Sequence, residues 1–460
     1  MAIFPSVIDN QTFAKRDDTQ NVKKLPTWGR NNYVTFLNWI AVVSLLFLTP
    51  LLQFYFVFSM QEADGSLTQP LLDFLKGRPL ASYWIPNTTK LIKAAKLYTF
   101  WTVFQILCAL FVPGRTGFGQ VTPAGHKLKY KVNGLNCYLL TLLVFFAGSY
   151  FNFWAPTIIY DYWIELSVCM QVHGFLLALF AYLKAKYYSS HPEDNKISNS
   201  VLYDFFLGVE LNPRIGDFDF KLFYNGRIGI ILWTLVNLSC AARQYQLYGA
   251  LTNSMVLLNI GQAVYVADFF FHEDWYLRTI DICHDHFGYY LAWGDTAWLP
   301  IMYALQAPFL VRHPRVLSTV ECFLISLLFS LGYLIFRSAN NQKDKFRATE
   351  GKAFFFNQKP TFINANYVTA DGKQRESKLL TSGWWGLARH FNYTADLMMS
   401  LSFCLVCGFD YVLPYFYFLQ LTILLVSRVF RDEAKCLSKY GVYWRKYCAK
   451  VKWRLIPKIF

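Results

Sequence analysis

Two basic residues just beyond an apolar run have the spacing of a phosphate-binding pair. Lys343 and Arg347 stand four residues apart in "NNQKDKFR", so on a helix they share one face. A guanidinium binds phosphate bidentately, and an ammonium adds a point charge. The alternative interpretation is a basic flank after a membrane-spanning helix. The pair alone does not decide between the two.

A second stretch offers aromatic faces and hydrogen-bonding groups directly before a predicted helix. It is "SGWWGLARHFNYTADL", Ser382 to Leu397. The tryptophans could belong to the aromatic belt that forms at membrane interfaces. Such a belt does not explain why Arg389 and Asn392 occur in the same stretch. We therefore expect this stretch to contribute to a polar-ligand site.

The third polar stretch is "RDEAKCLSKYGVYWRKY", Arg431 to Tyr447, which follows an apolar run. At 100° per residue, an arc of about 100° on one helix would collect six hydrogen-bonding residues. They are Asp432, Cys436, Lys439, Tyr440, Tyr443 and Tyr447, provided that Gly441 does not interrupt the helix. A helix lying among lipid headgroups would carry leucine or phenylalanine on that arc. The polar arc predicts one wall of a polar-ligand site.

Carboxyl groups and histidines gather in "TIDICHDHFGYYLAWGD", Thr279 to Asp295. His284, Asp285 and His286 are too close together to ligate one metal ion from one helix face, and we expect no metal site. Asp295 lies within an apolar run, where an ionisable group usually faces a cavity or a partner. It could donate a proton or take part in a structural hydrogen-bond network.

Composition indicates the elements that must position these residues. The chain has 460 residues, 55% of them hydrophobic and 19% aromatic, with a mean hydropathy of +0.25. Because a transmembrane helix needs about 20 mostly apolar residues, we predict an all-α, polytopic bundle of about ten spans. The predicted spans are Tyr33–Met60, Leu97–Pro113, Cys137–Trp154, Trp163–Leu183, Ile228–Ala242, Met255–Phe271, Phe287–Leu310, Val316–Phe336 and the stretch Thr394–Val426, which is long enough for two short helices.

Loop charge predicts how the bundle is oriented. With a cytoplasmic N-terminus, the basic loops and every polar stretch described above fall on the cytoplasmic side, as the positive-inside bias requires. We expect a cytoplasmic segment at 1–32, a transmembrane bundle at 33–336, and a C-terminal cofactor-binding region with two further spans at 337–460. The net charge of +15 is then explained by orientation in the lipid bilayer, and we expect no nucleic-acid partner. The glycines of "GRTGFGQ", Gly114 to Gln120, lack the strand-to-helix pattern of a dinucleotide fold, so we expect a loop there.

Several motifs together resemble the sterol reductase family, which includes C14, C24(28) and Δ7 sterol reductases. They are "YDFFLGVELNPR", "FDFKLFYNGR", "TIDICHDHFGYYLAWGD", "FRSANNQKDKFR", "ARHFNYTADL" and "RVFRDEAKCLSKYG". The resemblance covers most of the chain. Within the family, "FDFKLFYNGR" and "DICHDHFG" are most similar to the branch that reduces the Δ7 bond of 7-dehydrocholesterol or a related Δ5,7-sterol.

The resemblance implies an NADPH-dependent oxidoreductase with a sterol substrate. It places the nucleotide at Lys343, Arg347, Leu380, Trp385, Asn392, Tyr393, Asp432, Cys436, Leu437, Ser438, Lys439, Tyr440 and Tyr447. A sterol alkene must be protonated before it accepts a hydride, so a buried acid is also required. The candidates for the acid, or for the group that orients it, are Asp281, His286, Asp295, Glu210 and Tyr290.

Four alternatives remain open from the sequence. A C14 or C24(28) sterol reductase would share the motifs, and a non-enzymatic sterol-binding relative would show damaged cofactor positions. A transporter would show an internal repeat, and a membrane methyltransferase using S-adenosylmethionine would not need the two cations. The resemblance also implies the endoplasmic reticulum in a eukaryote or the inner membrane in a bacterium, and other sterol-pathway enzymes as possible partners.

Overall fold

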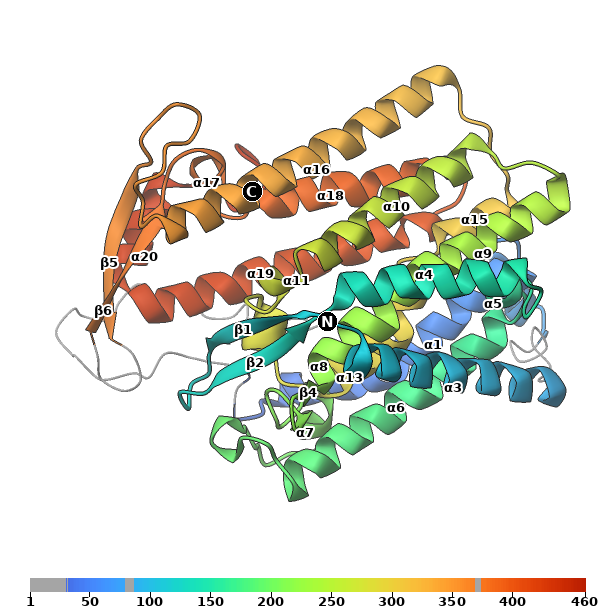
Figure 1. Cartoon of the computed structure of the whole chain (residues 1–460), viewed down its shortest axis with the longest axis horizontal. Coiled ribbons are helices and arrows are strands. Elements are labelled where there is room, and N and C mark those ends of the chain that lie inside the picture. Colours follow the sequence, from blue (N-terminus) through green and yellow to red (C-terminus); the bar gives the residue numbers. More distant parts are fainter. Residues whose placement is uncertain (1–29, 31, 79–86, 369–373) are drawn as a thin grey trace. The chain divides into compact units, whose positions relative to one another are not determined.

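The computed structural model describes residues 30, 32–78, 87–368 and 374–460 (Figure 1). Contacts divide the chain into two compact units. Of the described residues, the larger unit comprises those from Arg30 to Cys322 together with Phe403–Tyr417, and the C-terminal unit comprises those of Phe323–Ser402 with Phe418–Phe460. The predicted segment 1–32 lies outside the described residues, apart from Arg30 and Asn32.

The larger unit is built mainly from helices. Those of more than seven residues are α1 (Phe36–Glu62), α3 (Thr88–Phe111), α4 (Gly134–Tyr150), α6 (Trp163–Tyr187), α9 (Ile231–Tyr248) and α10 (Asn253–Phe271). Short helices connect them: α2 (Gln69–Leu75), α5 (Ile158–Asp161), α7 (Val201–Leu207), α8 (Phe220–Phe223), α11 (Glu273–Tyr276), α12 (Ile280–Cys283), α13 (Tyr289–Trp293), α14 (Leu299–Met302) and α15 (Gln306–Arg312). Side chains cap several helix N-termini; for example, Thr35 accepts from the Asn38 amide and Asn87 from the Lys90 amide.

The C-terminal unit contains most of α16 (Thr319–Ala348) and of α19 (Phe416–Tyr440). Its other elements are β5 (Phe362–Val368), β6 (Gln374–Leu380), α17 (Trp384–Leu387), α18 (Phe391–Leu405), which ends in the larger unit, and α20 (Val442–Lys450). Helices α16 and α18 run side by side (Figure 1), and a Cβ atom on Gly332 would lie 2.9 Å from the Ala395 carbonyl. Glycine is therefore needed where these two helices meet.

The helical, membrane-spanning fold is confirmed. Among the described residues, six helices are long and apolar enough to cross a membrane, and α4 is a shorter apolar helix. The six are Phe36–Glu62, Thr88–Phe111, Trp163–Tyr187, Asn253–Phe271, Thr319–Ala348 and Leu413–Tyr440. The stretch Thr394–Val426 forms parts of two helices, as expected.

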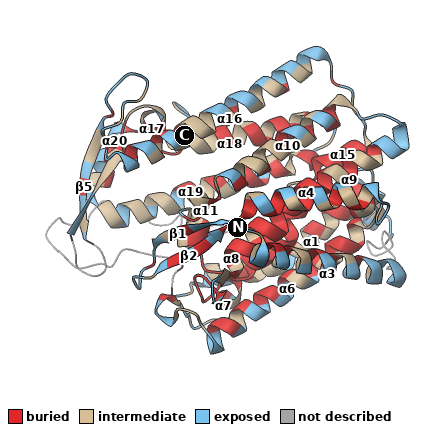
Figure 2. Ribbon diagram, viewed as in Figure 1, coloured by how far each residue is buried: buried red, intermediate tan, exposed pale blue. Residues whose placement is uncertain are grey.

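One predicted continuous span is wrong. Phe287–Leu310 is divided into α13, the π-helical segment η5 (Gly294–Trp298), α14 and α15. Pro300 and Pro308 each lack an amide donor, which disfavours one uninterrupted helix. These pieces are mostly buried (Figure 2), so they form the core of the larger unit together with α9.

Three antiparallel strand pairs were not expected from the sequence. They are β1 (Arg115–Val121) with β2 (Lys127–Val132), β3 (Arg214–Ile215) with β4 (Phe218–Asp219), and β5 with β6. All of the "GRTGFGQ" stretch except Gly114 belongs to β1, so the expectation of a loop there is wrong. Leu128, Tyr130 and Val132 alternate toward a small apolar cluster that includes Leu277, and this period of two is typical of a strand.

The helix predicted through Gly441 is interrupted there. Gly441 has a φ of +52°, so α19 ends at Tyr440 and α20 begins at Val442. Glycine adopts this left-handed conformation without a steric penalty. Tyr443 and Tyr447 consequently belong to a second helix and not to the arc that begins at Asp432.

Candidate functional site

The predicted cations lie on one helix of the C-terminal unit. Lys343 and Arg347 are in the last turns of α16, and the Lys343 ammonium lies 3.7 Å from the centre of the Trp385 ring. In the described part of the chain, neither side chain has a hydrogen-bond acceptor or a carboxylate within ion-pair distance. Two cations at this spacing, neither of them engaged in a hydrogen bond, can bind an anionic group.

Both tryptophans of helix α17 donate hydrogen bonds to α16. The Trp385 indole donates to the Ala339 carbonyl at 2.8 Å, and the Trp384 indole donates to the Ser338 hydroxyl at 2.8 Å. The turn before α17 depends on Gly383, which has a φ of +62° and packs against Gln342. The position of the Trp385 ring relative to Lys343 is thereby fixed.

Asn392 and Asp432 extend this surface from two other helices. The Asn392 amide donates to Asn340 at 3.3 Å, while its own side-chain oxygen is buried without a partner among the described residues. Asp432 Oδ2 lies 3.2 Å from His390 Nε2 and 3.9 Å from Cys436 Sγ. Lys343 also interacts electrostatically with Asp432. We call Lys343, Arg347, Trp385, Asn392, Asp432, Cys436 and Tyr440 the polar wall.

The tyrosines at the end of the chain pack beside Cys436. Tyr447 is buried with Trp444 and Val451, and Cys436 and Tyr440 pack against this cluster. The Tyr440 hydroxyl donates to Ser377 of β6 at 3.4 Å. Burial raises the pKa of the Tyr447 phenol, so the phenol stays protonated at neutral pH. The break at Gly441 thus still leaves Tyr447 close to the polar wall.

The remaining predicted nucleotide residues occupy different surroundings. Lys439 lies 4.2 Å from the centre of the Tyr367 ring, and Tyr393 stacks on His390 with ring centres 5.4 Å apart. Leu380 is buried in an apolar cluster with Phe346 and Trp385. Leu437 and Ser438 are exposed, because successive residues of a helix point in different directions and these two point away from Cys436.

An ion-paired clasp supports the polar wall and was not predicted. Arg389 donates to Glu433 at 2.6 Å, and Arg454 donates to the same carboxylate at 3.1 Å. Arg389 also donates to the Val451 carbonyl at 2.7 Å. The clasp holds the end of the chain against α18 and α19. Its residues lie up to 65 positions apart in the sequence, so no local spacing could have revealed it.

In the larger unit, Asp295 lies where two π-helical segments meet. Asp295 belongs to η5, and Asn225 of η4 (Tyr224–Ile230) donates to Asp295 Oδ1 at 3.0 Å. A Cβ atom on Gly229 would lie 2.4 Å from the Asp295 carbonyl oxygen, so the segments pack closely. Short π-helical segments occur frequently at functional sites.

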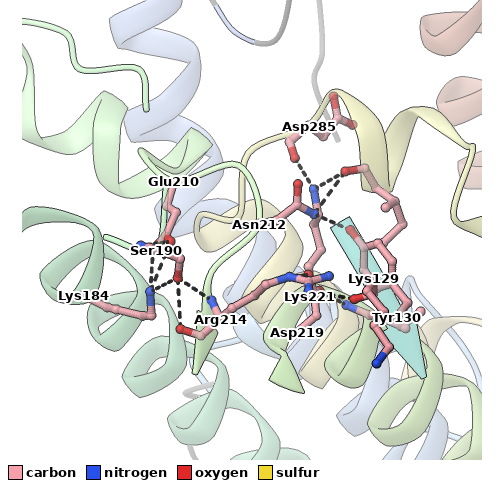
Figure 3. A network of polar contacts seen from close by, with 12 residues as sticks. Lys129, Tyr130, Lys184, Ser190, Glu210, Asn212, Arg214, Asp219, Lys221 and Asp285 are labelled. Carbon is pink, nitrogen blue, oxygen red and sulfur yellow. Dashed lines mark hydrogen bonds and ion pairs between the residues drawn. The ribbon is translucent and has the colours of Figure 1, made fainter. Parts of the chain in front are cut away.

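Glu210 belongs to a buried ion pair (Figure 3). The Lys184 ammonium contacts both Glu210 oxygens, at 3.1 and 2.9 Å, and the Ser190 amide donates to Glu210 at 2.7 Å. Arg214 continues the network by donating to Asp219 at 3.0 Å. Two donor groups thus hold the Glu210 carboxyl group in place with three hydrogen bonds, an arrangement that suits a positioning role.

The same network positions the loop that carries the other acid candidates. Lys221 donates to the carbonyls of Ile282 and Asp285 at 2.8 and 2.7 Å (Figure 3). Asp281 precedes and His286 follows this segment in the sequence, and both side chains are buried. His286 Nε2 lies 3.3 Å from the Asp194 carbonyl oxygen. Tyr290 follows on α13, stacked near Phe206 with ring centres 6.2 Å apart. Asp281, His286 and Tyr290 remain predictions.

Most of the chain is similar to enzymes of one family. The Ergosterol biosynthesis ERG4/ERG24 family matches residues 59–460. A 7-dehydrocholesterol reductase of Xenopus laevis is 48% identical over 447 residues, covering 94% of this chain and 94% of that protein. A 7-dehydrocholesterol reductase of Danio rerio is 47% identical over 460 residues, covering 96% of each chain. A Delta(14)-sterol reductase of Methylotuvimicrobium alcaliphilum is 39% identical over 431 residues, covering 94% of this chain and 96% of that one.

The apolar helices and the similarity to named sterol reductases define a multi-pass membrane oxidoreductase. The chain belongs to the ERG4/ERG24 family of sterol reductases. The predicted family is confirmed. Membership in this family argues against the transporter and methyltransferase alternatives.

Proposed function

We propose that this protein reduces the Δ7 double bond of 7-dehydrocholesterol or of a related Δ5,7-sterol, with NADPH as the reductant. The two relatives named for that reaction are 48% and 47% identical, whereas the Delta(14)-sterol reductase is 39% identical. The observation that carries the cofactor assignment is the polar wall, because it combines two cations, an aromatic ring and an Asn392 oxygen that has no hydrogen-bond partner within the described chain.

The residues of the polar wall fit a phosphorylated dinucleotide. Lys343 and Arg347 match phosphate groups, and Trp385 and Tyr440 offer aromatic surfaces. The unpartnered Asn392 oxygen can accept from a carboxamide or a hydroxyl, and Asp432 can accept from ribose. NADPH, when bound, supplies the hydride.

We assign the donation of a proton to the sterol to a residue of the larger unit. Protonation of a Δ5,7-diene at C8 gives an allylic cation shared by C7 and C5, and C7 then accepts the hydride. We assign the proton to Asp295, which is buried, lies on a π-helical turn and is oriented by Asn225 at 3.0 Å. Buried carboxyl groups favour the protonated form, which a general acid requires. Glu210 would help to position the loop Ile282–His286, because its carbonyl accepts from the Phe287 amide at 3.0 Å.

The domain organisation and location follow from the same proposal. Residues 33–336 would form the sterol-binding bundle, and residues 337–460 would bind the nucleotide on the cytoplasmic side. The membrane would be the endoplasmic reticulum in a eukaryote or the inner membrane in a bacterium. Contacts with other sterol-pathway enzymes are also proposed, on the ground that they share substrates.

Expression in a sterol-producing host that lacks Δ7 reductase tests this function. Sterol profiling should show that Δ5,7-sterols are replaced by Δ5-sterols. The second candidate is Δ14 reduction, which the 39% identical relative favours. Unchanged Δ5,7-sterols together with loss of Δ14 species would move the assignment to that reaction. Asp432→Ala is the negative control.

A further inference from the structure

The residues at the start of α3 have the sequence pattern of an N-glycosylation acceptor. Asn87 is followed by Thr88 and Thr89, which matches asparagine with serine or threonine two positions later and a residue other than proline between them. All three side chains are exposed, at the exposed end of α3 in Figure 2. The pattern therefore lies where an enzyme can reach it.

The other sites with this pattern are less suited to modification. They are Asn10, Asn237 and Asn392. Asn237 is only 1% exposed within α9, and the amide of Asn392 is engaged in a hydrogen bond within the polar wall. Asn10 belongs to the segment 1–32, which we place in the cytoplasm. In the part of the chain that the structure describes, Asn87 alone combines the pattern with an exposed side chain.

The local structure leaves available the atom of Asn87 that would carry a sugar. Asn87 is the N-cap of α3, and its Oδ1 atom accepts from the Lys90 amide at 3.0 Å. Its Nδ2 atom donates to no residue that the structure describes. An N-linked sugar is attached to Nδ2, so Oδ1 can still cap the helix. Modification and the folded conformation are therefore compatible.

The position of Asn87 relative to the membrane also fits. One spanning helix, α1, separates the N-terminal segment from Asn87, and the seven-residue α2 is too short to be a second crossing. With the N-terminus in the cytoplasm, Asn87 lies on the opposite side. In the endoplasmic reticulum that side is the lumen, where asparagine is glycosylated.

The first turns of α3 hold Asn87 outside the hydrocarbon. Three lysines occur in Thr88–Lys96, before the apolar run that begins at Leu97, and charged side chains are costly in the bilayer core. These nine residues of helix extend about 14 Å at 1.5 Å per residue. The acceptor amide is thus separated from the hydrocarbon by more than two helical turns.

We propose that Asn87 is N-glycosylated. Its Nδ2 atom would form a bond to the anomeric carbon of a lipid-linked oligosaccharide pyrophosphate, and the bond from that carbon to the pyrophosphate oxygen would break. The lipid pyrophosphate leaves, and the amide proton passes to a base of the transferase, so no atom is oxidised or reduced. The proposal rests on the proposed function for the orientation and for the endoplasmic reticulum as the location.

Deglycosylation of the full chain tests the site. The protein is expressed in cultured animal cells, and we expect peptide N-glycosidase F to raise its electrophoretic mobility by the shift of one glycan. Endoglycosidase H should produce nearly the same shift, as it does for glycans that stay in the endoplasmic reticulum. The first enzyme converts a glycosylated asparagine to aspartate, so mass spectrometry should locate that conversion at Asn87.

Two threonine variants form a matched pair. Thr88→Ala and Thr89→Ala each place a strong helix former in the first turn of α3, but only Thr89→Ala destroys the pattern. We expect the shift to disappear in Thr89→Ala and to persist in Thr88→Ala. Asn87→Asp retains a helix cap and should also lose the shift. Thermal unfolding of each variant reports folding.

The outcomes bear on the two proposals separately. A wild-type chain without a shift, or a shift that persists in Thr89→Ala, would overturn the glycosylation of Asn87. Sterol profiles of the same cells report the reaction. A glycosylated chain that leaves Δ5,7-sterols unchanged would refute the proposed reaction alone, and an active chain without a glycan would refute the modification alone.

Discussion

The Asp432 carboxylate connects the components of the polar wall at the residue scale. It lies 3.2 Å from His390 Nε2 and 3.9 Å from Cys436 Sγ, and it interacts electrostatically with Lys343. A bound nucleotide that donates a hydroxyl to this oxygen would join an existing network, and such networks are worth more than single contacts.

Removing Asp432 should weaken nucleotide binding. We expect Asp432→Ala to raise the Kd for NADPH by about ten- to a hundredfold, because a hydrogen bond to a charged group is lost. Tyr440→Phe should raise it by a smaller factor. Calorimetric titration measures both, with Lys446→Ala on the exposed side of α20 as control. Unaltered affinity in both variants would refute the nucleotide assignment.

The cations on α16 should distinguish phosphorylated from unphosphorylated cofactor. Lys343→Ala and Arg347→Ala should each weaken NADPH binding about tenfold. At least one of the two variants should weaken NADH binding much less. Lys345→Ala removes an exposed charge from the same helix and is the matched control. Equal losses for both nucleotides in both variants would mean that these residues do not bind the additional phosphate.

Asp295 should control turnover without affecting nucleotide affinity. Asp295→Asn preserves the side-chain shape but removes the proton donor, so kcat should fall at least a hundredfold. The Kd for NADPH should not change. Asp410→Asn, at an exposed position, serves as the matched control. Normal kcat in Asp295→Asn would show that Asp295 is not the proton donor and would leave Asp281, His286 or Tyr290 as candidates.

At the element scale, the long helices could be predicted and the breaks could not. The apolar run Tyr33–Met60 corresponds to α1, because hydropathy over about 20 residues reports a span directly. The π-helical segment that carries Asp295 packs against η4. These two segments are far apart in the sequence, so their contact could not be predicted from local spacing. The pairing of Glu210 with Lys184 was likewise invisible. The turn at Gly441 could have been expected, since glycine favours positive φ.

Lys221 gives the loop Ile282–His286 a stability that depends on pH. Burial lowers the pKa of this ammonium from its ordinary value to about 8, although Asp219 and Asp285 partly offset the effect. An unfolded lysine keeps a pKa of about 10.4. Between roughly pH 8 and 10 the unfolded chain thus binds more protons, and stability rises by up to about 1.4 kcal/mol per pH unit.

Lys221→Met should remove this dependence. We expect the wild type to gain in Tm, relative to the variant, as pH increases from about 8 toward 10, and no such gain below pH 8. The variant should also unfold at a lower temperature throughout, because the carbonyls of Ile282 and Asp285 lose their donor. Thermal unfolding in detergent measures both effects. A pH-independent difference would show that Lys221 is not desolvated.

At the scale of the whole molecule, two compact units separate the residues assigned to the two partners. The polar wall lies in the C-terminal unit, and the acid candidates lie in the larger unit. Sequence alone predicted the membrane class and the family, because composition and long motifs extend over most of the chain. The Arg389–Glu433–Arg454 clasp depends on contacts between distant segments, so it required the structure. The strand pairs join neighbouring segments, and the alternation of Leu128, Tyr130 and Val132 could have indicated one of them.

Isotope transfer by the purified protein tests the central claim most directly. The protein in nanodiscs receives 7-dehydrocholesterol and NADPH that carries deuterium at C4 of the nicotinamide, and the product is analysed by mass spectrometry and NMR. The account predicts a Δ5-sterol with one deuterium at C7 and a solvent-derived hydrogen at C8. NADPH-independent conversion, or deuterium found at C8 or C14 in place of C7, would contradict it.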